Sequence, residues 1–209
     1  MAVRRFLQRD DPVLKQLTTP VAEEAIAELR VGDVVYLTGE LFTARDRAHH
    51  RLLEFLNANK GSEIPIPPGA ILYHCGPIVR RRNEAWEVLA AGPTTSSRMD
   101  LMTPSLIEQL QIRGIIGKGG MGDATRAAMQ RHGCVYLAMT GGAAVLASAR
   151  IKAVTAVYWT ELGMAEAVWQ LEVVDFGPLV VGIDAQGASL YARVTAEARR
   201  QLAAIIPSP

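Results

Sequence analysis

The chain has 209 residues, of which 49% are hydrophobic and 21% are charged, as expected for one globular domain of ordinary composition. Lysine and arginine together number 22 and aspartate and glutamate 21, so the charge balance favours neither nucleic acid nor a membrane surface as a partner. No segment approaches the roughly 18 continuous apolar residues of a membrane span, and no signal peptide is evident, so we expect a cytoplasmic protein. We treat 1–209 as a single domain in which 1–11 form an extended N-terminal arm.

In the first half of the chain, hydrophobic periodicity and turn residues predict alternating helices and strands. Taken in order, we expect a helix at 18–29 capped by Thr18 or Thr19, a strand at 34–39, a helix from an N-cap at Thr43 to about Asn57, a loop at 60–70, and strands at 71–76 and 85–91 around a polar turn at 80–84.

The second half has the same alternation. Taken in order, we expect a helix at about 104–111, a strand at 114–117, a glycine loop, a helix at 124–133, a strand at 134–139, a turn at 140–142, a helix at 143–149, strands at 153–158, 169–174 and 179–183, and a closing helix from about Val194. This alternation predicts an α/β fold in which mixed sheet layers pack against helices.

The two cysteines, Cys75 and Cys134, match no metal-binding spacing and are too few to hold an iron–sulfur cluster by themselves. We expect both to be free, buried thiols in a reducing compartment. No set of metal ligands stands out elsewhere in the sequence, so we predict no metal site in this chain.

The loop Gly117–Gly122 reads G-K-G-G-M-G and satisfies the dinucleotide-binding pattern G-x-G-x-x-G between a strand and a helix. The acidic residue that should follow about 20 positions later, to hold a ribose, is missing from the apolar run there. We therefore disfavour nucleotide binding. The glycines still let backbone N–H groups face an anion, and Lys118 adds a positive charge.

Arg45 falls in the first turn of the helix predicted to end near Asn57, where the helix dipole disfavours a cation. Either it forms a surface pair with Asp46, or it points past the helix end at a carboxylate. His49 shares its face and either bonds the same ligand or covers the helix, whereas His50 is expected to be exposed to solvent.

Residues 92–100 read G-P-T-T-S-S-R-M-D, a run of four hydroxyl side chains closed by Arg98 and Asp100. In one interpretation Thr94 or Thr95 caps a helix and Arg98 pairs with Asp100. In the other, the run presents hydroxyls and N–H groups to a polar ligand, and Arg98 clamps a carboxylate. Taken with the other two cationic segments, this favours a small dicarboxylate as the ligand.

These motifs resemble one known family along most of the chain, from about residue 12 to 191. The family is that of the class I iron–sulfur fumarases and L(+)-tartrate dehydratases, and the likeness is to their β subunit or C-terminal region. The segments that carry it are LTTP at 17–20, GDVVYLTGELFTARDRAHHRL at 32–52, GPTTSSRMD, GKGGMG, and WTELGMAEAVWQLEV at 159–173. The resemblance implies a swivelling β/β/α domain.

The resemblance also implies roles for individual residues. The substrate-clamping arginine of the family falls on Arg45, its second arginine on Arg98, its catalytic threonine on Thr94 and its loop lysine on Lys118. We add Thr95 and His49 as substrate-binding candidates. A threonine hydroxyl needs nearby positive charge to act as a base, which Lys118 and Arg98 can supply. Ser96-Ser97 departs from the small residues common in the family, and either tunes the pocket or is a surface change.

The function implied is that of the β subunit of a two-component hydro-lyase that hydrates fumarate reversibly to (S)-malate, with the [4Fe-4S] cluster on a partner α subunit. The alternatives are L(+)-tartrate dehydration to oxaloacetate, a mesaconate or citramalate hydratase, or a stand-alone module that binds small carboxylates without catalysis. An α2β2 assembly is implied, or a homodimer when this chain is isolated. Trp159, Met164 and Trp169 are candidates for the α-subunit contact, although a core position is expected for most of them.

Overall fold

The structure is a computed structural model that describes residues 13–205, so the predicted arm at 1–11 lies outside the described residues. The elements of the first half are β1 (Leu14–Thr18), α1 (Glu23–Glu28), β2 (Val34–Thr43), α2 (Asp46–Asn57), η2 (Gly61–Glu63), β3 (Ile71–Tyr73), β4 (Ile78–Arg82), β5 (Ala85–Ala90) and η3 (Ser96–Met99). Those of the second half are α3 (Thr103–Leu110), β6 (Gly114–Gly117), α4 (Asp123–His132), β7 (Val135–Ala138), α5 (Ala144–Ser148), β8 (Ile151–Tyr158), η4 (Thr160–Leu162), β9 (Val168–Ile183) and α6 (Leu190–Ile205).

Most of the strands form one sheet in the order β1-β2-β3-β6-β7-β9-β8. Strands β1, β2, β3, β6 and β7 run parallel to one another, and β9 runs antiparallel to its neighbours. Strand β9 also pairs with β2, so β2, β3, β6, β7 and β9 close into a five-stranded barrel. The predicted α/β class with a mixed sheet is confirmed.

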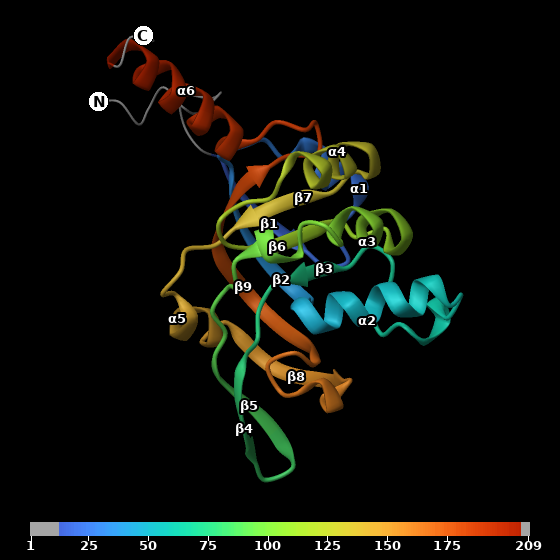
Figure 1. Ribbon diagram of the computed structural model, residues 1–209. Coiled ribbons are helices and arrows are strands. Elements are labelled where there is room, and N and C mark those ends of the chain that lie inside the picture. The colour runs from blue at the N-terminus through green and yellow to red at the C-terminus, as the bar shows by residue number, and fades with distance from the viewer. Residues whose placement is uncertain (1–12, 206–209) are drawn as a thin grey trace.

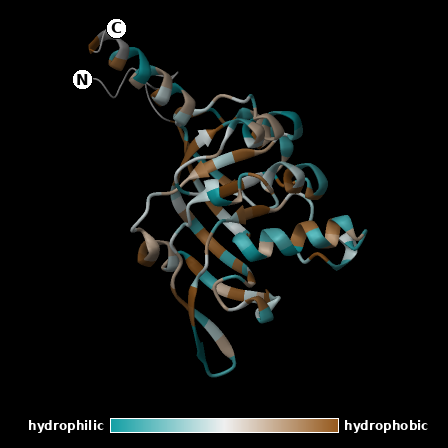
Figure 2. Ribbon diagram, in the orientation of Figure 1, coloured by the Kyte–Doolittle hydropathy of each residue, from teal (hydrophilic) through white to brown (hydrophobic). Residues whose placement is uncertain are grey.

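Side chains of opposite orientation along the strands build two hydrophobic cores. Ile71 and Tyr73 of β3 belong to the core inside the barrel, together with the buried Trp169 and Phe176 of β9. Leu72, between them in sequence, belongs to the second core, where the sheet meets helices α2, α3 and α4. These three helices lie on one side of the barrel, and hydrophobic residues concentrate on the strands (Figures 1 and 2).

The hairpin β4–β5 and helix α6 extend away from the barrel body at opposite ends (Figure 1). Near the turn of the hairpin, Trp86 packs edge-to-face on Trp169 of β9. Within 13–205, no helix combines the length and the apolar character needed to cross a membrane.

Several element boundaries differ from the predictions. Strand β1 was not predicted, and the helix expected at 18–29 shortens to Glu23–Glu28, without a side-chain cap from either threonine. The strands expected at 169–174 and 179–183 are one strand, because Gly177 and Pro178 fall in a bulge between residues paired with β2. The turn of the hairpin is confined to Asn83 and Glu84, and α6 begins at Leu190 rather than near Val194.

Thr43 is not the N-cap of α2. It is the last residue of β2 and is fully buried, because β2 continues beyond the predicted end at Gly39. Its hydroxyl accepts a hydrogen bond from the Trp169 backbone N–H at 3.0 Å and donates to the Ala167 carbonyl at 3.4 Å. The hydroxyl thus fastens β2 to the start of β9, where the barrel closes.

This contact gives a test of barrel closure. Thr43→Val keeps the side-chain volume but leaves the buried Trp169 N–H unpaired, which costs about 1–3 kcal/mol in the free energy of unfolding. The control Thr155→Val removes a hydroxyl that bonds a carbonyl from an exposed position on β8, and changes that free energy by less than about 0.5 kcal/mol. Urea unfolding measures both, and equal effects would contradict the bridging role of Thr43.

Candidate active site

Two predicted site residues and one that was not predicted follow neighbouring strands at one edge of the barrel. Arg45 follows β2, His74 follows β3 and Lys118 follows β6, and these strands are parallel neighbours in the order β2-β3-β6. Their carboxyl ends therefore lie side by side, which is where open parallel sheets bind their ligands. Residues far apart in the sequence are brought together by strand order alone.

The hydroxyl run lies between the ends of β3 and β6. The Thr94 N–H donates to the His74 carbonyl at 2.6 Å, the Lys118 N–H donates to the Thr94 carbonyl at 3.3 Å, and the Ser96 N–H donates to the Lys118 carbonyl at 3.0 Å. Thr95 and Lys118 form an isolated parallel bridge. Within residues 13–205 the half-buried Thr94 hydroxyl has no hydrogen-bond partner, so it is available to a ligand.

Ser96 has a structural place in this arrangement. It is fully buried, and its hydroxyl bonds His74 Nδ1 at 2.9 Å and the Tyr136 hydroxyl at 3.0 Å. A Cβ at Gly117 would lie 1.9 Å from the Ser96 oxygen, so the close approach of β6 requires glycine there. The interpretation of Ser96-Ser97 as a surface change is wrong for Ser96 and holds only for the exposed Ser97.

Arg98 does not pair with Asp100. Its guanidinium makes two hydrogen bonds to the Asp46 carboxylate, at 3.1 and 2.5 Å, and so joins η3 to the first residue of α2. Asp100 instead accepts hydrogen bonds from the Gly122 N–H at 2.9 Å and the Thr125 hydroxyl at 2.7 Å, at the start of α4. Neither Thr94 nor Thr95 acts as a side-chain cap of η3.

Arg45 is the N-cap residue of α2 rather than part of its first turn. It does not pair with Asp46, which is engaged by Arg98; its Nε lies 3.4 Å from Glu166 Oε1. A Cβ placed on Gly76 would lie 2.6 Å from Arg45 Nη1, so the arginine side chain runs across the backbone just after β3. Arg45 and Arg98 thus approach the same edge from the N-terminus of α2.

Lys118 supplies a third positive charge. It is half-buried, and a Cβ on Gly141 would lie 3.9 Å from its Nζ, which places the side chain beside the turn after β7. Within the described chain no carboxylate pairs with it. The site therefore combines two arginines that already face carboxylates with a lysine that does not.

His49 and His74 form a buried pair behind these charges. Both are fully buried, their ring centroids are 5.0 Å apart, and neither Nε2 has a hydrogen-bond partner among the described residues. His49 Nδ1 bonds the Arg45 carbonyl at 2.9 Å. Burial lowers the pKa of His49 to about 4 and holds the pKa of His74 well below its usual value, so both rings are neutral near neutral pH. Contact of His49 with substrate stays a prediction.

The residues described here do not fit an iron–sulfur cluster. Cys75 and Cys134 are both free and buried, as predicted, and burial raises the pKa of the Cys75 thiol to about 12. No group of three or more histidine, cysteine or acidic side chains in residues 13–205 is arranged to hold a metal ion.

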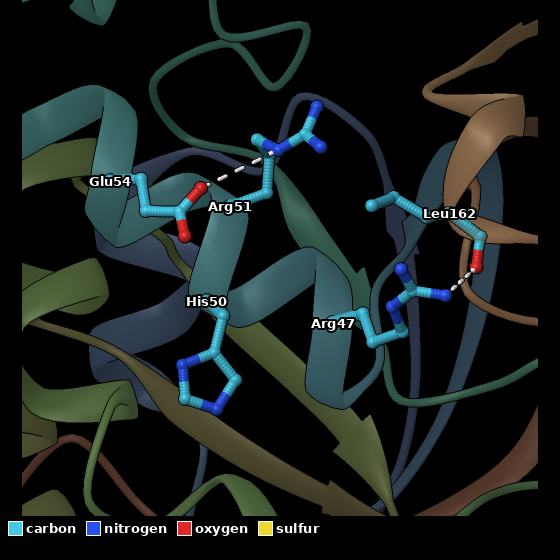
Figure 3. Close-up of a pocket in the computed structure, with 5 residues that line it drawn as sticks. All are labelled: Arg47, His50, Arg51, Glu54 and Leu162. Carbon is cyan, nitrogen blue, oxygen red and sulfur yellow. Dashed lines mark hydrogen bonds and ion pairs between the residues drawn. The ribbon is translucent and has the colours of Figure 1, made fainter.

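A separate polar pocket lies along the outer face of α2 (Figure 3). It is lined by Arg47, His50, Arg51, Glu54 and Leu162. The Arg47 guanidinium donates to the Leu162 carbonyl at 2.6 Å, so the pocket marks the contact between α2 and the segment around η4. His50 is exposed, as predicted. Of the three residues considered for the α-subunit contact, Trp169 is in the core, whereas Met164 is 40% exposed.

Two residues of the site were missed by sequence analysis. His74 follows the buried run ILY directly, so the rule that ligands gather at strand ends would have found it. Glu166 precedes β9 and reaches α2 across 119 positions of sequence, a contact that no local pattern reveals. Arg45, Thr94, Arg98 and Lys118, which were predicted, are linked to one another through the backbone and side-chain contacts described above.

The architecture and the site define an α/β domain that presents cations and a free hydroxyl at the carboxyl ends of parallel strands. The chain matches the family described as Fumarase C-terminus over residues 7–194, and it belongs to that family. It is 43% identical to the β subunit of the L(+)-tartrate dehydratase of Escherichia coli K12, over 85% of this chain and 87% of that subunit.

Two further relatives have names of the same kind. A Methanocaldococcus jannaschii protein, whose name assigns it provisionally as an L(+)-tartrate dehydratase β subunit, is 41% identical over 89% of this chain and 95% of its own length. A Geobacillus stearothermophilus protein, named provisionally as a class I fumarate hydratase, is 43% identical over 84% of this chain but only 33% of its own length. In that longer protein the region similar to this chain is therefore one part of a larger polypeptide.

The buried histidine pair predicts acid sensitivity. In the unfolded chain a histidine binds a proton below a pH of about 6.5, whereas folded His49 stays neutral down to a pH of about 4. The free energy of unfolding should therefore fall as the pH is lowered, by about 2 kcal/mol from His49 alone at a pH of about 5, and further in the same direction through His74.

Urea unfolding of the wild type, His49→Gln and His50→Gln at a pH of about 7 and about 5 checks this expectation. The exposed His50 is the control, and its variant should keep the wild-type pH dependence. In His49→Gln, the pH dependence of the free energy of unfolding should be about half of that of the wild type. An unchanged pH dependence in His49→Gln would show that the buried ring does not titrate as argued.

Proposed function

We propose that this chain is the β subunit of a two-component hydro-lyase that hydrates fumarate reversibly to (S)-malate. Membership of the family and the names of the relatives support a hydro-lyase. The proposal is supported by three observations: Arg45 and Lys118 follow the parallel strands β2 and β6, which flank β3; backbone hydrogen bonds join Thr94 to His74 and Lys118; and Arg98 contacts Asp46, one residue from Arg45.

Arg45 and Arg98 form the proposed clamp for a diacid. A guanidinium binds a carboxylate through two parallel N–H donors, so two arginines fix both ends of a four-carbon substrate. The Arg98 side chain is 49% exposed and can turn toward a ligand, and Asp46 holds it near the helix terminus in the meantime. Thr95 is proposed to contact the substrate beside Thr94, because its backbone is paired with Lys118.

Thr94 is the proposed base. In dehydration its deprotonated oxygen accepts the proton from the carbon next to the one that carries the leaving hydroxyl and becomes the hydroxyl, and in hydration that hydroxyl returns the proton. A threonine hydroxyl is a weak base at neutral pH unless positive charge stabilises its deprotonated form. Lys118 is connected to Thr94 through the backbone, pairs with no carboxylate among the described residues, and is proposed to supply that charge.

The [4Fe-4S] cluster is assigned to a partner α subunit, because the described residues of this chain do not fit one. The β-subunit names of the relatives support an α partner for this chain. We further propose that the domain is of the swivelling β/β/α type, that the assembly is α2β2, and that it works in the cytoplasm.

L(+)-tartrate dehydration to oxaloacetate is the second candidate, and it is favoured by the names of the relatives that this chain spans almost completely. A mesaconate or citramalate hydratase would use the same clamp. A stand-alone carboxylate-binding module would use the clamp without the partner.

Reconstitution decides between these candidates. The chain is co-expressed with its proposed α-subunit partner, purified without oxygen, and assayed with fumarate, (S)-malate, L(+)-tartrate and mesaconate. We expect turnover of fumarate and (S)-malate by the assembly and none by the isolated chain. Dicarboxylate binding by the isolated chain, without recruitment of any partner or turnover, would replace the enzyme by the binding module.

Within the active assembly, Thr94→Ala should lower kcat by about 10²–10⁴-fold, because it removes the proposed base. Thr94→Ser keeps a hydroxyl and should retain most of the activity. Ser97→Ala is the matched control, since it deletes an exposed hydroxyl from the same run and should leave kcat unchanged. Full activity in Thr94→Ala would exclude Thr94 as the base.

A further inference from the structure

The N-terminus of α2 is capped by a carboxylate from a distant segment. Arg45, at the N-cap position, makes no side-chain capping bond. Glu166, between η4 and β9, fills that place: its Oε2 accepts a hydrogen bond from the Arg47 N–H at 2.9 Å. Its other oxygen lies 3.4 Å from Arg45 Nε, and its side chain is only 17% exposed. One carboxylate therefore serves both the helix end and the arginine.

Arg45 is confined from several directions. Its Nη1 and Cδ lie 2.6 and 2.9 Å from a Cβ built on Gly76, and the Ala165 carbonyl lies 2.5 Å from the same point. The side chain is thus held beside the backbone that follows β3, next to the turn that carries Glu166. Nε is buried and makes no hydrogen bond within residues 13–205, so its contact with Glu166 is an ion pair. No described residue accepts a hydrogen bond from the Nη atoms, which are free for a ligand.

We propose that Glu166 is a positioning residue that holds Arg45 in the orientation that receives a substrate carboxylate. The inference rests on the proposed function, because it takes Arg45 as the substrate clamp. An arginine at a helix N-terminus is repelled by the helix dipole, and a free arginine side chain populates many rotamers. A carboxylate on the Nε side offsets the repulsion and restricts the side chain, while the Nη side stays open.

Glu166 has two possible roles, which are to position Arg45 or only to compensate its charge. These two roles change substrate binding in opposite directions, so an experiment can distinguish them. A carboxylate near the site repels a dianionic substrate, so its removal without any loss of positioning would lower KM. Loss of positioning would raise KM, because part of the substrate's binding energy would then be used to order the Arg45 side chain. The direction of the change in KM therefore separates positioning from simple charge compensation.

The test compares Glu166→Gln with Glu161→Gln in the α–β assembly. In Glu166→Gln the amide oxygen of the new side chain can still accept from the Arg47 N–H, so the variant keeps the helix cap and loses only the charge. Glu161 is the matched control, because it pairs with Arg51 of α2 at 2.9 Å from the same connecting segment without touching Arg45. For the substrate that the wild type turns over, KM should rise about tenfold in Glu166→Gln, with kcat within about twofold. KM should stay unchanged in Glu161→Gln.

A second measurement is independent of catalysis. In the full ¹⁵N-labelled chain, the Arg45 Nε–H resonance, assigned by its loss in Arg45→Lys, should be distinct and slow to exchange with solvent. It should remain so in Glu161→Gln and move to the position of exposed arginines in Glu166→Gln. An unchanged resonance, or a KM that falls in Glu166→Gln, overturns the positioning role. If the wild-type assembly turns over no dicarboxylate, the proposed function fails. The Arg45 Nε–H resonance is then the remaining test of the contact between Glu166 and Arg45.

Discussion

The closure of the barrel by β9 is the constraint on which the rest of the structure depends. This one strand of 16 residues pairs with β2, β7 and β8, and so joins the first parallel strand of the barrel to the last. Parallel strands need crossovers, and those of β2 and β6 are helices packed on one side of the barrel. With the helices on the outside and the interior filled by side chains, the carboxyl ends of β2, β3 and β6 are left to form the site.

The site is built from charges that the fold holds before any ligand arrives. Asp46 orients Arg98 and Glu166 faces Arg45, and both contacts converge on the N-terminus of α2. The backbone of Lys118 is hydrogen-bonded to Thr94 and Ser96 of the hydroxyl run, and no carboxylate among the described residues pairs with its side chain. Behind them the two neutral histidines fill space and bond Ser96 and the Arg45 carbonyl without adding charge. Under the proposed function this arrangement is ordered before the anionic substrate binds, which lowers the cost of binding.

Most helices and the central strands could be predicted because their patterns are local. The buried runs GIIG and VYLA, and the amphipathic helix ending at Asn57, have unambiguous periodicity. Strand β1 was missed because its two leucines, Leu14 and Leu17, lie three positions apart, so the segment lacks the period-two alternation of apolar residues that is typical of a strand. Thr43 was misassigned because a threonine before a helix has the usual appearance of a cap. Here the strand continues past Gly39, and the hydroxyl is used across the barrel instead.

By itself, the sequence determined the α/β class, the family, the free buried thiols and the identity of the charged candidates, since these depend on composition and on motifs contiguous in the chain. Only the tertiary structure decided the partners of those charges. Arg98 meets Asp46 across 52 positions, and Asp100 turns to the start of α4. Glu166 reaches the helix that Arg45 begins. These pairings join residues that are brought together by strand order and barrel closure, and neither of these is encoded in local spacing.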